Sequence, residues 1–414
     1  MKKLLVVLFI TCCIASPIFG QKPIKDLKPT VILVSLDGFR YDYLEKYKPN
    51  NLNELAKSGV RAKWMIPSYP SLTFPNHYAI ATGLYPSENG IVGNTIYSPE
   101  FDATFSLGKR EEVQNGRWWL GEPIWVTAEK QGQRAGCFFF PGTEAEIAGK
   151  RPTFWKTYDG KIPFPDRVNQ ILTWLDLPQN ERPTFYTLYF DEPDHAGHDF
   201  SPESKEVGDA VKNVDDQIGL LMDGLKQRKI NKKVNVIIVS DHGMTKFNPT
   251  NVVLLDDYFD LTKAEIAFSG QIVNIFPKDG DAETIYQALK AKPMEHAKCY
   301  RKSEFPARFH YQNSDRIAPI ICMADEGWAI SNGKFYNAAK AEADAAKGFR
   351  GAHGYDNQIE SMRAIFIGSG AAFRKNKVVE PFENISVYNV MARILKLTPA
   401  KNDGDLKVIK TVLK

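Results

Sequence analysis

The sequence predicts an α/β protein in which a mostly parallel central sheet is sandwiched by helices. Two observations predict this fold class. Short runs rich in β-branched and aromatic residues alternate with longer amphipathic stretches, and the runs are apolar throughout rather than at every second residue. Strands that are covered by helices on both faces have this continuous apolar pattern, which is typical of parallel sheets.

The elements follow one another in a regular order. A strand is expected within residues 30–38, and helical spacing follows over residues 43–59. A second strand, within residues 182–193, precedes a long amphipathic stretch at residues 201–227. Further strands are expected within residues 234–243 and 361–370.

The domain organisation that we expect is a signal peptide over residues 1–20 and a catalytic domain over residues 21–414. Two lysines, an apolar run from Leu4 to Ala15 and small or turn-forming residues up to Gly20 are typical of an export signal that is cleaved before Gln21. Between about residues 245 and 348 the strand pattern loosens into short alternating pieces, which we interpret as an inserted smaller subdomain beside the site.

The predicted location is periplasmic or secreted, without a transmembrane segment in the mature chain. The apolar run near the start is shorter than the roughly 20 residues that a spanning helix needs, and no later stretch approaches that length. A lipoprotein anchor on Cys12 or Cys13 is the less favoured alternative, because Thr11 is a poor match to the small residue expected before a lipidated cysteine.

Charge and cysteine content narrow the function classes. The 53 basic and 49 acidic residues leave the chain near neutral, so we expect no specific binding to a nucleic-acid polymer or an anionic membrane. Of the three cysteines beyond the predicted signal, Cys299 and Cys322 can pair in an oxidising compartment, whereas Cys137 lies in the apolar run CFFF and is expected to be a buried thiol. The oligomeric state stays open.

Acidic residues end the first three predicted strands. They are Asp37, Asp191 and Asp241, and they converge if the strands are parallel, because ligands bind outside the carboxyl ends of the strands in open α/β sheets. Mixed carboxylate and imidazole ligands suit Zn²⁺, and a metal pair can hold both the attacking and the leaving oxygen of a phosphoryl transfer. Phosphoester hydrolysis is therefore the leading hypothesis, with seven candidate side chains: Asp37, Thr73, Asp191, His195, Asp241, His242 and His353.

Thr73 is the candidate nucleophile. Pro75 fits the first turn of a helix that continues through AIATG, so the Thr73 hydroxyl is expected at the positive end of that helix. An ordinary N-cap threonine is the alternative. A neighbouring metal site favours the nucleophile, because zinc lowers the pKa of a coordinated hydroxyl.

The histidines differ in their local signals. In DEPDHAGH, Pro193 and Gly197 are expected to exclude a regular helix and to form a loop around Asp191 and His195. Asp241 and the adjacent His242 can bind one metal only where the strand breaks, which Gly243 permits. The remaining candidates are His353, in a flexible glycine-flanked loop, His77, expected to pack or to orient a ligand, and His198, for which a hydrogen bond to substrate and a ligand-orienting role are both open.

The motifs TFPNHY, EPD-x-x-GH, SDHGM, ADEGW, HGYDN and FENISVYN are together very specific. From about Val31 to the C-terminal end, the chain resembles the nucleotide pyrophosphatase/phosphodiesterase family of the alkaline phosphatase superfamily. The resemblance implies an alkaline-phosphatase-like fold with two Zn²⁺ ions per chain and makes Thr73 the nucleophile. It implies one zinc on Asp191, His195 and His353, and the other on Asp37, Thr73, Asp241 and His242.

The same resemblance suggests substrate-binding residues. Asn94, in GIVGNTIY, matches an asparagine that donates to a phosphate oxygen, a role that fits preorganised charge stabilisation. Phe74 and Tyr158 match an aromatic pair that sandwiches a nucleobase, and core packing is the alternative for both. Leu72 stands where some members carry a phosphate-contacting lysine, so contacts to a polyphosphate tail are expected to be weaker here.

The resulting hypothesis is an exported, zinc-dependent nucleotide pyrophosphatase/phosphodiesterase that acts on a small nucleotide substrate. It would release nucleoside 5′-monophosphates through a phospho-threonine intermediate. A phosphomonoesterase, a phosphonate hydrolase and a choline or lipid phosphodiesterase on the same fold stay open. A sulfatase is disfavoured because no Cys or Ser nucleophile is followed by the Pro and Arg of its motif. A non-catalytic nucleotide-binding protein is disfavoured because it should have lost ligands.

Overall fold

The structure, a computed structural model, describes residues 22–278 and 281–414. The predicted signal peptide over residues 1–20, its cleavage site before Gln21, and Cys12 and Cys13 lie outside the described residues. Within the described ranges, no helix combines the length and the apolar character that crossing a membrane requires.

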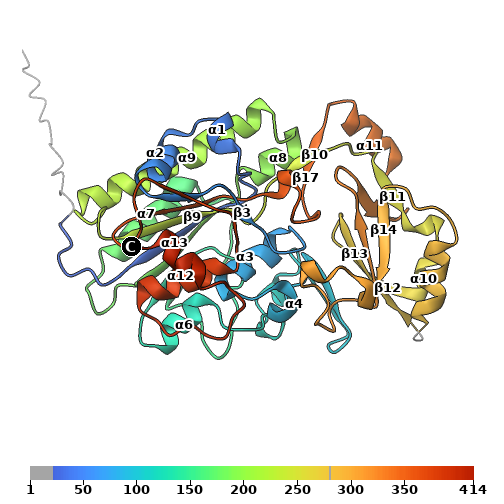
Figure 1. Cartoon of the computed structure of the whole chain (residues 1–414), viewed down its shortest axis with the longest axis horizontal. Helices are drawn as coiled ribbons and strands as arrows, with labels where there is room; N and C mark the ends of the chain where they lie inside the picture. The colour runs from blue at the N-terminus through green and yellow to red at the C-terminus, as the bar shows by residue number, and fades with distance from the viewer. Residues whose placement is uncertain (1–21, 279–280) are drawn as a thin grey trace, which may run out of the picture.

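An eight-stranded sheet forms the centre of the larger part of the molecule (Figure 1). The strand order is β19-β2-β18-β9-β1-β8-β6-β7. In chain order these strands are β1 (Val31–Leu36), β2 (Val60–Ala62), β6 (Ala135–Phe138), β7 (Phe154–Trp155), β8 (Phe185–Phe190), β9 (Asn235–Val239), β18 (Phe366–Ser369) and β19 (Lys377–Val379).

The sheet confirms the predicted fold class. Strand β1 pairs in parallel with both β8 and β9, and every residue of β1 and β9 is buried. Burial on both faces explains why apolar residues occupy both faces of these strands. The strand within residues 361–370 differs in direction, because β18 runs antiparallel to β9 and to β2. The sheet is therefore mixed.

Helices cover both faces of this sheet (Figure 1). Val31 and Leu33 of β1 pack in the same cluster as α3, α6 and α12, whereas Ile32 and Val34 pack in the same cluster as α2, α7 and α9. The helices are α1 (Tyr43–Lys46), α2 (Asn50–Ser58), α3 (Thr73–Thr82), α4 (Pro86–Asn89), α5 (Arg110–Val113), α6 (Ile124–Lys130), α7 (Phe164–Leu175), α8 (Asp194–Phe200), α9 (Lys205–Gln227), α10 (Ala282–Lys290), α11 (Ala338–Ala345), α12 (Ser386–Leu395) and α13 (Lys407–Val412).

Two of the predicted helical stretches are present. The stretch over residues 43–59 is divided into α1 and α2 at Pro49, which is the N-cap of α2. The stretch at residues 201–227 contains α9, whose N-cap Ser204 accepts a hydrogen bond from the Val207 backbone N–H. The expected loop at DEPDHAGH is wrong, because residues 194–200 form α8.

A second sheet lies to one side of the first (Figure 1). Its four strands are antiparallel in the order β12-β13-β15-β14, and α10 packs on them. The chain leaves and re-enters the larger part through the antiparallel pair β10 and β17. This path supports the predicted insertion over residues 245–348, whose status as a subdomain stays a prediction. The remaining strands are β3 (Met65–Ile66), β4 (Thr95–Ser98), β5 (Ala103–Ser106), β10 (Thr245–Phe247), β11 (Val252–Leu254), β12 (Ala264–Phe268), β13 (Ile272–Pro277), β14 (Ala297–Arg301), β15 (Ile320–Ala324), β16 (Ala329–Ser331), β17 (Arg350–Ala352) and β20 (Phe382–Glu383).

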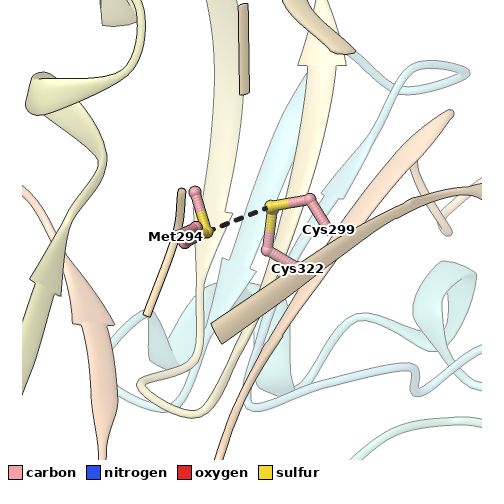
Figure 2. The surroundings of a disulfide bond; sticks show 3 residues. All are labelled: Met294, Cys299 and Cys322. Carbon is pink, nitrogen blue, oxygen red and sulfur yellow. Dashed lines mark hydrogen bonds between the residues drawn. A yellow bond between two sulfur atoms is a disulfide. The ribbon is translucent and has the colours of Figure 1, made fainter. Parts of the chain in front are cut away.

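A disulfide bond links the neighbouring strands β14 and β15 of the second sheet (Figure 2). Cys299 and Cys322 are register partners on these strands, and their bond confirms that they pair. The Met294 sulfur lies 3.7 Å from the Cys299 sulfur. This is a sulfur–sulfur contact, because a disulfide sulfur has no proton to donate. Cys137 is a buried free cysteine, as predicted, and burial raises the pKa of its thiol to about 12.

Candidate active site

The candidate site lies at the carboxyl ends of three neighbouring strands. Asp37 follows β1, Asp241 and His242 follow β9, and α8 begins at Asp194, shortly after β8. All four of these side chains are buried. Parallel pairing of β8, β1 and β9 therefore brings together residues that are more than 200 positions apart in the sequence.

The first cluster contains four of the predicted ligands. The Nε2 atom of His242 lies 2.9 Å from Asp241 Oδ2, 3.6 Å from Asp37 Oδ1 and 3.3 Å from Thr73 Oγ1. A break directly after β9 makes this possible. Only glycine fits at residue 243, because a Cβ atom there would lie 2.1 Å from the backbone oxygen of Ser361. The structure thus brings Asp37, Thr73, Asp241 and His242 together.

The second cluster is made by Asp194, His198 and His353. The Nε2 atoms of His198 and His353 lie 3.1 Å apart. Asp194 Oδ2 lies 3.4 Å from His198 Nε2, and Asp194 Oδ1 lies 3.6 Å from His353 Nε2. Asp194 and His198 are four residues apart on α8, so they share one face of the helix. These three residues form one of the groups whose donor atoms are close enough to hold a metal ion.

The structure does not bring Asp191 and His195 to these clusters. Asp191 Oδ1 accepts a hydrogen bond of 2.8 Å from Arg167, and Oδ2 lies 3.4 Å from His195 Nδ1. The His195 side chain is 62% exposed. In the described part of the chain, neither residue belongs to a group that can hold a metal ion. Asp194 and His198, three positions later in the same motif, occupy the places expected for Asp191 and His195.

This register error has a physical cause. Pro193 is the N-cap residue of α8 and therefore does not interrupt the helix. The backbone N–H that proline lacks takes part in no helical hydrogen bond at this position. Gly197 is tolerated within the helix and packs closely on the Met244 side chain. The useful signal was in the sequence, since the acidic residue and the histidine of EPD-x-x-GH are themselves Asp194 and His198.

All three imidazoles are oriented by backbone carbonyl groups. The Nδ1 atoms of His198, His242 and His353 lie 3.0, 2.8 and 3.0 Å from the carbonyl oxygens of Gly351, Gly243 and Ser71. A carbonyl oxygen accepts only, so each Nδ1 carries a proton, and in the neutral form of each ring Nε2 then carries a lone pair. The Nε2 atoms of all three rings therefore face the clusters as acceptors, which is the arrangement of metal-ligating histidines.

Three carboxylate oxygens of the two clusters also have no hydrogen-bond donor nearby. Among the described residues, Asp37 Oδ1, Asp194 Oδ1 and Asp241 Oδ2 are buried without a hydrogen-bond partner. Asp241 Oδ2 lies 2.9 Å from His242 Nε2, and this contact joins two acceptors when the His242 ring is neutral. Buried unpaired acceptors are costly, and a cation relieves that cost. The oxygen and nitrogen donors present therefore fit a metal ion.

Burial and mutual repulsion shift the ionisation of these groups. Burial, together with Asp241 and Asp194, raises the pKa of Asp37 well above its usual range. Burial also opposes ionisation of Asp241, but His242 and His77 outweigh it and hold the pKa of Asp241 well below its usual range. Burial, His242 and His198 lower the pKa of His353. His353 is therefore neutral at neutral pH, as a metal ligand must be.

His77 orients its neighbours, one of the two roles expected for it. Its Nε2 atom lies 2.8 Å from the Ser35 hydroxyl, and its Nδ1 atom lies 2.8 Å from the Thr73 carbonyl oxygen. Among the described residues, Asp37, Asp194 and His242 form another group whose donor atoms are close enough to hold a metal ion, and so do Asp37, His77 and Asp241. Because both ring nitrogens of His77 already have partners, we assign His77 the orienting role.

Asn94 and Phe74 adjoin Thr73. The Asn94 side-chain oxygen accepts a hydrogen bond of 3.0 Å from the Phe74 backbone N–H, which leaves the Asn94 amide hydrogens free to donate. The Phe74 ring packs on Phe105 and Trp119 with centroid separations of 5.9 Å. Leu72 is the buried N-cap of α3.

Tyr158 is connected to Asp37 through Tyr189. Its ring centroid is 6.1 Å from that of Tyr189, whose hydroxyl donates a hydrogen bond of 2.6 Å to Asp37 Oδ2. The Tyr158 side chain is 37% exposed, unlike the core aromatics around it. The substrate-binding roles of Phe74, Asn94 and Tyr158 stay predictions.

Fold and site define the class: an α/β protein of the alkaline-phosphatase-like type, with clustered carboxylates and imidazoles at the carboxyl edge of its sheet. The chain belongs to the type I phosphodiesterase / nucleotide pyrophosphatase family, whose family model matches residues 31–356. The predicted resemblance is thereby confirmed.

Named relatives agree with this assignment. The chain is 42% identical over 406 residues to the venom phosphodiesterase CdcPDE of Crotalus durissus collilineatus, which covers 96% of this chain and 47% of the relative. It is 40% identical over 396 residues to human ectonucleotide pyrophosphatase/phosphodiesterase family member 1, with 93% of this chain and 42% of the relative covered. The chain thus spans about half the length of the curated relatives it matches.

A solved structure of murine ectonucleotide pyrophosphatase / phosphodiesterase 5 has the same fold. Its TM-score is 0.86 at 33% identity, and the match covers 93% of this chain and all of that chain. An inactive variant of the same murine protein in complex with AMP matches with a TM-score of 0.85 at 33% identity.

Proposed function

We propose that this protein is an exported, zinc-dependent phosphodiesterase that hydrolyses phosphodiester or phosphoanhydride bonds of nucleotides and releases nucleoside 5′-monophosphates. Membership of the phosphodiesterase family supports the reaction class. The AMP complex of a relative that is 33% identical supports a nucleotide as the substrate. The disulfide bond supports export, because disulfides persist in oxidising compartments.

The metal assignment follows the geometry of the two clusters. One zinc would be held by Asp194, His198 and His353, and the other by Asp37, Thr73, Asp241 and His242. When bound, such a pair lowers the pKa of a coordinated hydroxyl and offsets negative charge on the phosphoryl oxygens. The observation that carries the proposal is the convergence of three Nε2 lone pairs on buried carboxylate oxygens without donors.

Thr73 would be the nucleophile. Its Oγ1 forms a bond to phosphorus while the bond from phosphorus to the leaving oxygen breaks, and the leaving oxygen keeps the electron pair and gains a proton in place of the one that Thr73 loses. Water then cleaves the phospho-threonine: its oxygen stays on the released monophosphate and a proton returns to Thr73. Asn94 would donate its free amide hydrogens to a non-bridging oxygen.

The nucleobase would lie between Phe74 and Tyr158. Phe74 directly follows the nucleophile, and its packing on Phe105 and Trp119 fixes its ring. Tyr158 is 37% exposed. Leu72 is buried and has no charge to offer, which supports weak contacts to a polyphosphate tail.

The nucleophile is tested with Thr73→Ala and Thr73→Ser. Without the hydroxyl, turnover of a nitrophenyl nucleotide diester should fall at least about a thousandfold, whereas serine should retain partial activity because it retains the hydroxyl. Full activity of Thr73→Ala contradicts the mechanism. Rates on the matching monoester, a phosphonate and a choline phosphodiester separate the proposal from the alternatives on the same fold, and a faster rate on any of these would replace the nucleotide diester as the assigned substrate.

A further inference from the structure

We propose that the buried pair of Arg167 and Asp191 is a positioning device that holds Tyr158 in place to stack on the nucleobase, so that it governs substrate affinity and not bond cleavage. This inference rests on the proposed function. It gives a role to a carboxylate that the sequence predicts to be a metal ligand.

The pair joins the end of β8 to the segment that follows Tyr158. Arg167, on α7, is fully buried, and Asp191 is 7% exposed. Beside its bond to Asp191, the guanidinium donates hydrogen bonds of 3.0–3.2 Å to three backbone carbonyl oxygens, which belong to Tyr189, Ile162 and Gly160. One side chain therefore ties residues 160–162 to the strand that leads to the site.

Tyr158 lies against this pair. A Cβ atom on Gly160 would lie 3.1 Å from the Tyr158 hydroxyl oxygen and 3.9 Å from Asp191 Oδ2, so both oxygens adjoin the same point. The Tyr158 ring packs edge-on against Phe139 at 5.0 Å, and the Arg167 guanidinium lies 5.2 Å from the centre of the Phe139 ring. Burial and Asp191 raise the pKa of Tyr158 to about 12, which agrees with this proximity.

A second anchor holds the backbone of Tyr158. The Tyr158 N–H donates a hydrogen bond of 3.0 Å to Glu144, and this buried carboxylate also accepts from Arg110 and Gln114. Tyr158 is thus fixed at its main chain by one carboxylate and bounded at its hydroxyl by another. An aromatic ring that is held before binding does not have to be ordered by the ligand, so its stacking contributes more affinity.

The test uses Asp191→Asn and the conservative Arg167→Lys, which keeps the positive charge but loses the planar fork. Asp176→Asn is the matched control, because Asp176 pairs with the buried Arg228 at the far ends of α7 and α9. Two substrates are compared, the nitrophenyl ester of thymidine 5′-monophosphate and methyl nitrophenyl phosphate, which has no base. Bound zinc and the thermal unfolding midpoint are measured for every variant.

We expect Asp191→Asn to raise KM for the nucleotide diester about tenfold, with kcat, zinc content and turnover of the methyl ester within about twofold of wild type. Arg167→Lys should shift KM in the same direction by less, and Asp176→Asn should leave both substrates unaffected. Combining Asp191→Asn with Tyr158→Ala should add nothing to the KM of Tyr158→Ala alone, because the carboxylate acts through the ring.

Other outcomes overturn the inference. Loss of zinc and of turnover on both substrates in Asp191→Asn would make Asp191 a metal ligand, and additive effects in the double variant would separate Asp191 from Tyr158. Calorimetric titration with AMP distinguishes a failure of the proposed function from a failure of the positioning role. If the wild type binds AMP but cleaves neither diester, the proposed function is wrong, and an unchanged Kd for AMP in Asp191→Asn then overturns the positioning role as well.

Discussion

Replacing His198 and His195 separately by alanine distinguishes the two candidate registers of the DEPDHAGH motif. Both side chains are exposed imidazoles beside an aspartate four residues earlier, at 3.4 Å in each case. Only His198 lies near another potential metal-ligating atom, since its Nε2 is 3.1 Å from His353 Nε2. The two substitutions remove the same kind of histidine–aspartate contact, but His198→Ala also removes the hydrogen bond to the Gly351 carbonyl oxygen and a candidate metal ligand.

The expected magnitudes differ by more than two orders. An exposed histidine–aspartate pair is worth about 0–1 kcal/mol, so His195→Ala should change turnover by no more than about fivefold. His198→Ala leaves only Asp194 and His353 in the second cluster, and loss of one of three protein ligands should reduce turnover at least about a thousandfold, or about 4 kcal/mol.

The assay is turnover of a nitrophenyl nucleotide diester, together with the zinc content of each purified variant. His198→Ala should hold less zinc than the wild type, and His195→Ala should hold the wild-type amount. Asp194→Asn and Asp191→Asn provide the same comparison of zinc content and kcat with carboxylates. If His195→Ala lost its zinc while His198→Ala kept it, the assignment of the second cluster would be wrong.

Three further predictions concern the metals, the base and the free thiol. Chelation should abolish turnover and zinc should restore it, with Asp241→Asn and His353→Ala each impaired because they remove oriented, deprotonated ligands; fewer than two zinc ions per active chain at saturation would contradict the paired site. Tyr158→Ala should raise KM for a nucleotide diester about tenfold, on the scale of roughly 1–3 kcal/mol for a stacked base, and an equal loss on a diester without a base would show a structural role instead. Burial raises the pKa of Cys137 to about 12. In the native protein that comprises residues 21–414, this thiol should therefore not react with a disulfide reagent at pH 8, whereas it should react after denaturation. Rapid labelling of the native protein would contradict its burial.

The strands and the Thr73 helix could be predicted from the sequence because their signals are local. The runs that became β1, β8 and β9 are mostly apolar on both faces, and they are buried on both faces, apart from one partly buried residue of β8. Pro75 marked the first turn of α3. The direction of β18 could not be predicted, because an apolar run of this kind is compatible with parallel and antiparallel pairing.

The α8 register could not be fixed by local rules. A proline before Asp194 either breaks a helix or begins one, and the outcome depends on where the preceding strand ends. Arg167 had no signal at all in the sequence, since an arginine on an amphipathic helix is usually exposed. Its burial follows from the position of α7 against the end of β8, where Asp191 and three backbone carbonyl groups receive its hydrogen bonds.

The paired metal site is tested most directly by anomalous diffraction at the zinc absorption edge, from crystals grown with zinc. We predict two anomalous peaks. One should lie about 2.0–2.2 Å from Asp194, His198 and His353, and the other at similar distances from Asp37, Asp241 and His242, beside the Thr73 hydroxyl. A single peak, or a peak coordinated by Asp191 and His195, would contradict the account.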